Sequence, residues 1–318
     1  GEASRSFIVL INQDSFVEGP ETFNVVLSNP TGMVLGGPSI ATIQITDGNE
    51  RANNTLDDAR SYVTQQYHDF LNRQPDPSGG DFWTNQISSC GNDAGCLEVK
   101  RINVSAAFFL SIEFQDTGYL IERIYKTAYG NAVGTSTFPA PHQLAVPVVR
   151  LNELLADSQE IGQNVIVNQG NWQKQLEDNK QAFAAEFVQR SRFINAFPLA
   201  LTPAQFVDTL NANAGSPLSQ TERDQLVNDL QSNVRTRAQA LREVAEHPNL
   251  KAAEFNRAFV LMQYFGYLRR NPNDPQDSDY SGYDFWLTKL NQQEGNYIDA
   301  EMVKAFISSV EYRSRFGR

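Results

Sequence analysis

Two cysteines are the residues whose spacing most directly predicts a covalent bond. Cys90 and Cys96 are the only cysteines of the chain, and they enclose a short polar loop with a glycine at each end. Such a loop closes easily as a small disulfide ring. Two reduced thiols are the alternative, and zinc is disfavoured because the pair has an unusual spacing and no histidine nearby. A disulfide would imply an oxidising compartment.

Residues suited to catalysis are scattered along the sequence. His68, His142 and His247 are far apart, and none lies in a zinc-binding motif or beside a candidate nucleophile. The sequence also lacks the serine elbow and the glycine-rich phosphate loop of common enzyme families. We therefore expect that the chain is not an enzyme.

One proline-containing loop is rich in aspartate, a residue type that can bind calcium. Its carboxylates belong to Asp274, Asp277, Asp279 and Asp284. Calcium prefers several oxygen ligands, but this spacing does not fit the regular calcium-binding loop of helix-loop-helix sites. Roles in turns and helix caps are the favoured interpretation, and calcium is the alternative.

The composition limits the possible partners. The chain has 318 residues, with 26 Lys and Arg against 37 Asp and Glu and a formal net charge of -11. This length fits two or three domains. The negative charge repels phosphate backbones, so we do not expect nucleic acid as a partner. No apolar run approaches the roughly 18 to 20 residues of a membrane span.

The first 48 residues predict antiparallel β-strands. Apolar and β-branched residues gather at 6–11, 22–27 and 40–45, and glycine-proline turns separate these runs. Three strands leave two open edges and bury little surface. We therefore expect an incomplete β-sandwich that is completed by other copies of the chain or by upstream strands.

Residues 14–23, 27–30, 35–36 and 43–47 resemble the second half of a Calx-beta domain. In that family acidic loop residues bind calcium, and the resemblance implies Asp14, Glu18 and Asp47 as the matching positions. Gln13, Gly48 and Asn49 stand where further aspartates are expected, which predicts weak or absent calcium binding. Solvated turn carboxylates are the alternative.

An internal repeat is the strongest pattern of the sequence. An apolar helical stripe at 63–71 recurs at 260–268, and each copy continues into an arginine and a proline turn. Ser-Gly-x-Asp-Phe-Trp follows at 78–83 and 281–286, and Ser-x-Glu-aromatic at 111–114 and 309–312. The predicted repeat anchors are Tyr67, Arg73, Asp81, Trp83, Tyr264, Arg270, Asp284 and Trp286.

These anchors predict a structural role for the repeat. We expect Ser78 and Ser281 to cap the following helices, and both tryptophans to be buried in the core. The arginines can bond to terminal carbonyls of the preceding helices. A carbohydrate-stacking platform is the alternative for the aromatic residues.

The repeat resembles the bacterial domain-of-unknown-function family numbered 4214, and residues 309–317 resemble the phycobilisome linker domain more weakly. The first likeness implies a secreted or surface location and a scaffold role. We predict a mainly α fold behind the β segment. Its predicted parts are β residues 1–48, a linker at 49–57, repeat 1 at 58–158, a divergent helical region at 159–253 and repeat 2 at 254–318.

Two functions follow from this organisation. The first is a non-catalytic extracellular structural or assembly subunit, such as a surface layer, a filament or an adhesin stalk, that binds other copies of itself. The alternative is an adhesion module for glycan or protein, in which the segment 130–147 and the acidic loop with Tyr280 and Tyr283 form the contact face.

Overall fold

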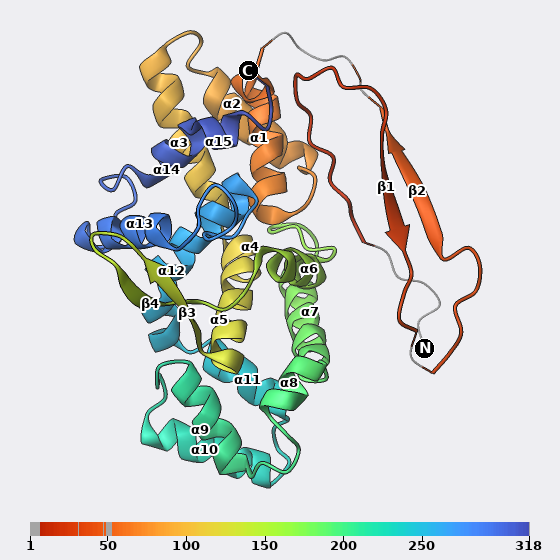
Figure 1. The fold of residues 1–318 in the computed structure, drawn as a ribbon, viewed down its shortest axis with the longest axis vertical. Helices are drawn as coiled ribbons and strands as arrows, with labels where there is room; N and C mark the ends of the chain where they lie inside the picture. The colour runs from red at the N-terminus through yellow and green to blue at the C-terminus, as the bar shows by residue number, and fades with distance from the viewer. Residues whose placement is uncertain (1–6, 31, 47, 49–52, 318) are drawn as a thin grey trace.

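The helices of the chain form one body around a continuous apolar core (Figure 1). The structure is a computed structural model that describes residues 7–30, 32–46, 48 and 53–317. The first repeat contains α1 (Ala59–Gln66), α2 (Pro77–Ser88), α3 (Ala94–Phe109), α4 (Ile112–Gln115) and α5 (Gly118–Tyr129). The middle region contains α6 (Leu151–Gly162), α7 (Trp172–Phe187), α8 (Ser191–Ala196), α9 (Pro203–Asn213), α10 (Gln220–Gln231) and α11 (Arg237–Ala245). The second repeat contains α12 (Pro248–Gln263), α13 (Ser281–Gln292), α14 (Met302–Ser308) and α15 (Val310–Arg313). The predicted mainly α fold is confirmed.

Side-chain caps explain where several helices begin. Helices α9, α10 and α11 each start with a capping box, in which a Ser or Thr pairs with a Gln or Glu three residues later. Asp76 caps α2 by accepting a hydrogen bond from the N–H of Gly79 at 2.9 Å, and Pro77 occupies the first helical position. The prediction that Ser78 caps α2 is wrong, because Ser78 already lies in the first turn and its hydroxyl donates to Asp76.

A π-helical turn lies at the centre of each repeat. Helix α1 continues into η2 (Tyr67–Leu71), and α12 continues into η3 (Tyr264–Leu268). Each turn ends at a residue with left-handed backbone, Asn72 at φ 51° and Arg269 at φ 53°. The two turns contact each other, and the rings of Phe70 and Tyr267 meet edge to face with centroids 5.0 Å apart. The two repeats therefore share one core.

The predicted break at 130–147 is a β-hairpin. Its strands β3 (Asn131–Ser136) and β4 (His142–Pro147) pair antiparallel. The backbone N–H of Tyr280 donates to the carbonyl of Thr135 at 2.8 Å. Ser281 does not cap α13, because its hydroxyl instead accepts from the N–H of Thr137 at 2.7 Å. The segment predicted as an open contact loop is thus regular β-structure that packs against the start of α13.

A second hairpin near the N-terminus stands away from the helical body (Figure 1). Its strands β1 (Glu21–Val26) and β2 (Ile40–Ile45) pair antiparallel, with Phe23 opposite Ile43. The strand predicted at 6–11 is wrong for its described residues, 7–11, which belong to no strand. The carbonyl of Ile8 accepts a hydrogen bond from Gln159 of α6 at 2.9 Å instead. The described residues thus form one hairpin here and no sandwich.

The described part of the predicted linker, residues 53–57, packs against the end of the chain. It contains η1 (Thr55–Asp57), in which Leu56 is buried. The N–H of Thr55 donates to the carbonyl of Phe316 at 3.3 Å, and Asn54 donates to the carbonyl of Arg313 at 2.9 Å. These residues therefore join the two ends of the helical body.

Candidate binding site

Each repeat contains an arginine that forms a paired hydrogen bond with a distant glutamate. Arg73 donates to Glu113 at 2.7 and 2.9 Å, and Arg270 donates to Glu311 at 2.5 and 3.1 Å. Burial opposes the charge of both arginines, but these bonds raise the pKa of Arg73 and of Arg270 above the ordinary value. The predicted bonds to helix-terminal carbonyls are thus replaced by a clamp between the proline turn and the Ser-x-Glu segment.

A pocket lies beside each clamp. The first has a volume of about 480 Å³ and the second of about 290 Å³. Their shared lining consists of Tyr67, Leu71, Arg73, Trp83, Ala107, Phe108, Ser111 and Glu113 in the first repeat, and of Tyr264, Leu268, Arg270, Trp286, Ala305, Phe306, Ser309 and Glu311 in the second. The repeat therefore builds the same concave site twice.

Both pockets carry one carboxylate in excess of their arginine. Asp76 joins Glu113 in the first pocket, and Asp277 joins Glu311 in the second. Burial opposes the ionised form of Asp76, but bonds from Gly79 and Ser78 hold the pKa of its carboxyl below the ordinary value. Burial raises the pKa of Tyr67 to about 12, so this phenol stays protonated at neutral pH. Both sites therefore repel anions.

The tryptophan anchors lie at the edge of the core. Trp83 and Trp286 are half-buried, which corrects the prediction that both are buried core residues. Trp83 packs against Phe108 with ring centroids 5.8 Å apart, and Trp286 packs against Phe306 at 5.6 Å. Each indole thus packs on the core with one side and lines a pocket with the other. It is half-buried because no further side chain of the described residues fills the pocket.

The two repeated aspartates have different partners. Asp81 forms an exposed ion pair with Arg60 at 2.5 Å. Asp284 accepts from the hydroxyl of Ser136 at 2.7 Å and lies 3.3 Å from His142, so it joins α13 to the β3–β4 hairpin. Neither aspartate belongs to the lining of the two repeated pockets.

The two tyrosines predicted to form a contact face are buried. Tyr283 is 0% exposed and donates to the carbonyl of Arg257 at 3.1 Å. Tyr280 is 8% exposed and covers Gly134 of β3. The expectation of a binding loop at these residues is therefore wrong, because Tyr280 packs on the hairpin at 131–147 and Tyr283 is buried with its hydroxyl bonded to α12.

The structure describes two of the three acidic residues proposed for calcium, Asp14 and Glu18. Asp14 and Glu18 line one pocket of about 450 Å³, in which Asp14 accepts from the N–H of Phe16 at 2.8 Å. Asp47 lies outside the described residues. No group of three or more His, Cys, Asp or Glu within the described ranges is arranged to hold a metal ion.

The aspartates of the 274–284 loop bind protein groups. Asp274 pairs with Arg150 at 2.9 Å, and Asp277 pairs with Arg270 at 2.8 Å. Asp279 accepts from the N–H of Ser281 at 2.9 Å. The geometry matches the turn and capping interpretation of this loop.

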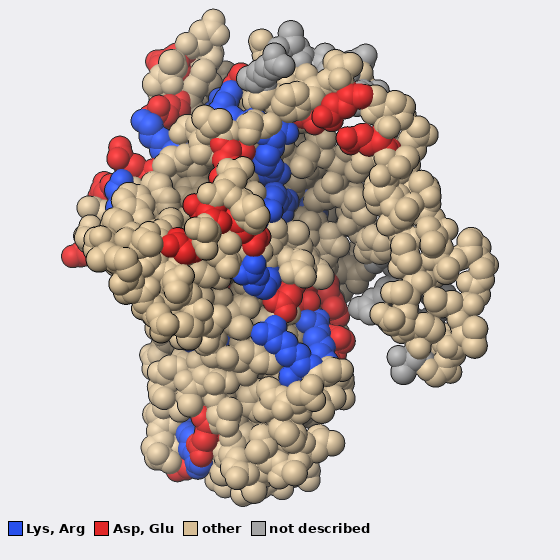
Figure 2. Space-filling view, in the orientation of Figure 1, with Lys and Arg blue, Asp and Glu red and all other residues tan. Residues whose placement is uncertain are grey.

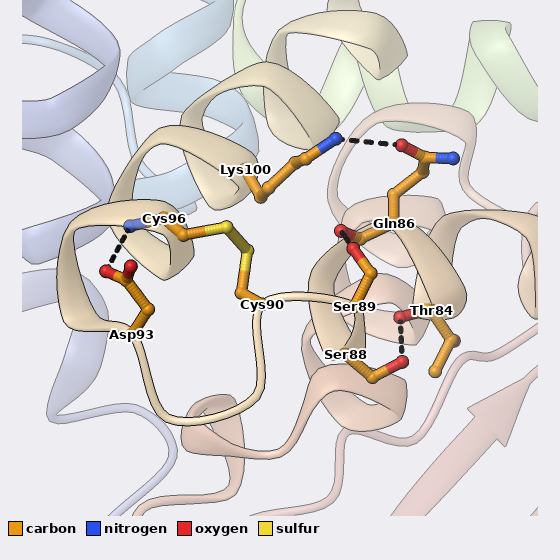
Figure 3. Close-up of a disulfide and its surroundings, with 8 residues drawn as sticks. All are labelled: Thr84, Gln86, Ser88, Ser89, Cys90, Asp93, Cys96 and Lys100. Carbon is orange, nitrogen blue, oxygen red and sulfur yellow. Dashed lines mark hydrogen bonds between the residues drawn. A yellow bond between two sulfur atoms is a disulfide. The ribbon is translucent and has the colours of Figure 1, made fainter.

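Cys90 and Cys96 form the predicted disulfide (Figure 3). Their Cα atoms are 5.6 Å apart, and the bond closes the loop between α2 and α3. Asp93 caps α3 inside this ring by accepting from the N–H of Cys96 at 3.0 Å (Figure 3). The disulfide therefore fixes the start of α3 relative to the end of α2.

The sequence interpretation missed the carboxylates that complete the sites. Glu113 and Glu311 lie in the repeated Ser-x-Glu-aromatic segment, which we assigned no function. The sequence contained a signal for these pairs. Both copies have an arginine at the same position and a glutamate at the equivalent position downstream, and a buried arginine needs a counter-charge.

None of the helices that the structure describes combines the length and apolar composition of a membrane span. No curated protein and no solved structure matches the chain. Residues 48–117, which include Arg73, Trp83 and Glu113 of the first pocket, match the model of a family described as a domain of unknown function, DUF4214.

Proposed function

We propose that this chain is a non-catalytic structural or assembly subunit that binds further copies of itself through the N-terminal hairpin. One observation carries the proposal: the hairpin has an apolar face that the rest of the molecule leaves partly open. Phe23, Val25, Ala41 and Ile43 alternate onto this face of the paired strands. Ile43 is 43% exposed although it lies opposite Phe23.

The opposite face of the hairpin is polar at its centre and start, and Val26 lies opposite Ile40 at its other end. Asn24 and Thr42 lie opposite each other at the centre, and the Thr42 hydroxyl donates to Asn24 at 2.7 Å. A sheet face that carries mainly apolar side chains is typical of a layer that packs on a second layer. A lone two-stranded hairpin is marginally stable in water, so a second layer would stabilise it.

Charge supports pairing at this hairpin. Soluble proteins usually protect open strand edges with charged side chains. The sequence has no Asp, Glu, Lys or Arg between Glu21 and Asp47. Figure 2 shows the projecting hairpin as a surface almost free of charged side chains, whereas charges of both signs are spread over the helical body. The hairpin is therefore suited to contact with another protein surface.

More specifically, we propose that the hairpin is part of a Calx-beta-like sandwich whose missing strands come from another copy of the chain. The helical repeats then act as a rigid spacer between such contacts. The disulfide between Cys90 and Cys96 supports an oxidising and therefore extracellular location. A bacterial surface layer, filament or adhesin stalk would use both properties.

Sedimentation velocity over a range of protein concentrations tests the proposal. We expect the full chain to form larger species as its concentration rises. Ile43→Lys places a charge on the apolar face and should weaken this association at least about tenfold.

Thr42→Lys is the matched control, because it adds the same charge one residue away, at the polar centre of the opposite face, and should change the association less. A wild-type chain that stays monomeric at every concentration would contradict the proposal. Equal effects of the two lysines would also contradict it, because the apolar face would then not be the contact surface.

A further inference from the structure

The first pocket differs from the second in how much of its tryptophan is available. Among the described residues, no Lys or Arg lies over the ring of Trp83. In the second repeat, the ammonium group of Lys289 lies 5.5 Å from the centroid of the Trp286 ring. Gln86 occupies the position of Lys289 in the first repeat. The first pocket thus combines the larger volume with the less occupied aromatic surface.

Two further features favour a ligand at Trp83. Trp83 is half-buried, and its indole N–H is not among the buried polar atoms of the described residues that lack a partner. The neighbouring ring of Phe82 is 55% exposed, so the aromatic surface continues onto the rim of the pocket. A half-buried indole beside a second ring offers both a stacking face and a polar contact.

The polar rim of the first pocket is rich in hydrogen-bonding groups. Asp76 and Ser78 line it from the start of α2, and Asn168 and Gln169 line it from the segment between α6 and α7. Gln169 donates to Asp76 at 3.2 Å, so this segment is held against the repeat. Carboxylate, amide and hydroxyl groups around an aromatic face suit a ligand that has hydroxyl groups on an apolar ring.

Charge distinguishes between the ligands that such a rim could bind. The carboxylate in excess repels anions. A cation is also disfavoured, because the Arg73 guanidinium lines the same pocket and lies 3.5 Å from Asp76, the carboxylate in excess. Asp76 also accepts hydrogen bonds from Ser78, Gly79 and Gln169, which occupy its oxygens. Arg73 is held there by Glu113 and cannot turn away without breaking both of its bonds. An uncharged ligand meets neither conflict.

We infer that the pocket of the first repeat binds an uncharged saccharide, with the sugar ring stacked on Trp83 and its hydroxyl groups bonded to the rim. Its volume of about 480 Å³ lies within the usual range of small-ligand sites, roughly 300–1,000 Å³, and is larger than the second pocket's volume of about 290 Å³. The second repeat therefore serves as an internal comparison. This inference is independent of the hairpin contact.

Indole N–H signals in nitrogen-15 NMR spectra of the full chain test the inference without a mutation. The chain has 3 tryptophans, so its indole signals can be assigned with single Trp→Phe variants. The probes are the methyl glycosides of glucose, galactose, mannose and N-acetylglucosamine and the β-1,4-linked disaccharides of glucose and N-acetylglucosamine. We expect at least one to shift the Trp83 signal saturably, with a smaller shift at Trp286 and none at Trp172.

Variants measured by calorimetry with the same sugar complete the test. Trp83→Ala should weaken binding at least about tenfold, whereas Trp172→Ala, which removes a tryptophan outside both pockets, should leave the affinity unchanged. Failure of all probes to shift the Trp83 signal would overturn the inference. Equal shifts at Trp172, or binding of glucuronate or of a capped lysine as tight as that of the sugar, would also overturn it.

Discussion

The two repeats keep the same frame but differ where they touch each other. Both retain the arginine–glutamate clamp and the tryptophan beside it. At their junction, Gln66 of the first repeat donates to the Tyr312 hydroxyl at 3.2 Å and accepts from the Ser105 hydroxyl at 2.5 Å. Gln263 is the equivalent residue of the second repeat, and both of its buried amide atoms have no hydrogen-bond partner among the described residues.

Substitutions at equivalent positions explain this difference. Phe114 stands in the first repeat where Tyr312 stands in the second, and Val303 stands in the second where Ser105 stands in the first. The hydroxyl groups therefore serve only one of the two glutamines. The clamp residues, which bond within each repeat, are kept, whereas Ser105 and Tyr312, whose hydroxyls reach the other repeat, have no equivalent hydroxyl in the other copy.

The largest expected effect comes from Asp69, which has no counterpart in the second repeat. Its carboxylate is buried, accepts from Tyr312 at 2.8 Å, and lies 3.5 Å from Arg269 and 3.7 Å from Arg315. Asp69→Ala leaves two arginines without this counter-charge, so the free energy of unfolding in urea should fall by about 3–5 kcal/mol. Asp81→Ala removes an exposed ion pair and should cost less than about 1 kcal/mol. Equal losses would show that the junction does not depend on Asp69.

The next effect concerns Gly266, the residue of the second repeat that corresponds to Asp69. A Cβ atom at this position would lie 2.5 Å from the Phe70 ring. Gly266→Ala should therefore lower the free energy of unfolding by about 1–3 kcal/mol through overpacking. Phe70→Leu in the same chain should recover part of the loss. Gly36→Ala is the control, because a Cβ there meets nothing within 4 Å and the melting temperature should not fall.

These two junction residues also show what the sequence could predict. The apolar stripes gave the helices and the repeat, because a period of 3.6 residues depends only on local spacing. They did not predict that Asp69 and Gly266 meet the other copy, since that contact joins residues about two hundred positions apart. The same limit explains Tyr280, which packs on the hairpin at 131–147, and Tyr283, whose hydroxyl bonds to Arg257 of α12. The strand predicted at 6–11 is wrong for its described residues, 7–11, because β-rich composition does not provide a pairing partner.

The disulfide is a third difference between the repeats. It closes the α2–α3 loop, whereas the corresponding loop of the second repeat, 293–301, contains no cysteine. Replacing Cys90 and Cys96 with serine should cost about 2 kcal/mol in the unfolding equilibrium, because the ring is short. Amide hydrogen exchange should rise at the start of α3 and stay unchanged at 293–301. Faster exchange at both loops would mean that the bond stabilises the whole core.

Glu122 is a buried carboxyl at the junction that should make the free energy of unfolding depend on pH. Unlike Asp69, it lacks a hydrogen-bond partner for one of its oxygens among the described residues. Burial, followed by the charge of Glu254, raises the pKa of Glu122 from 4.5 to about 8, and its Oε2 atom has no hydrogen-bond partner among the described residues. Between these values the folded chain keeps a proton that the unfolded chain releases. The free energy of unfolding should therefore fall as pH rises from 4.5 to 8, by up to about 1.4 kcal/mol per pH unit. Glu122→Gln should flatten this part of the profile, and an unchanged slope would assign it to other groups.

The smallest expected effect tests the comparison of the two repeats most directly. The same Gln→Leu substitution should change the free energy of unfolding in opposite directions at the two equivalent positions. Gln263→Leu removes two buried amide atoms that have no partner among the described residues, so the free energy of unfolding should rise by about 1 kcal/mol. Gln66→Leu breaks the bonds to Tyr312 and Ser105 and should lower it by about 1–2 kcal/mol. Urea unfolding of both variants decides the matter. If both variants lose stability, the amide of Gln263 must be hydrogen-bonded in solution, by water or by a rearranged side chain. The environments of Gln66 and Gln263 would then differ less than the neighbouring residues predict.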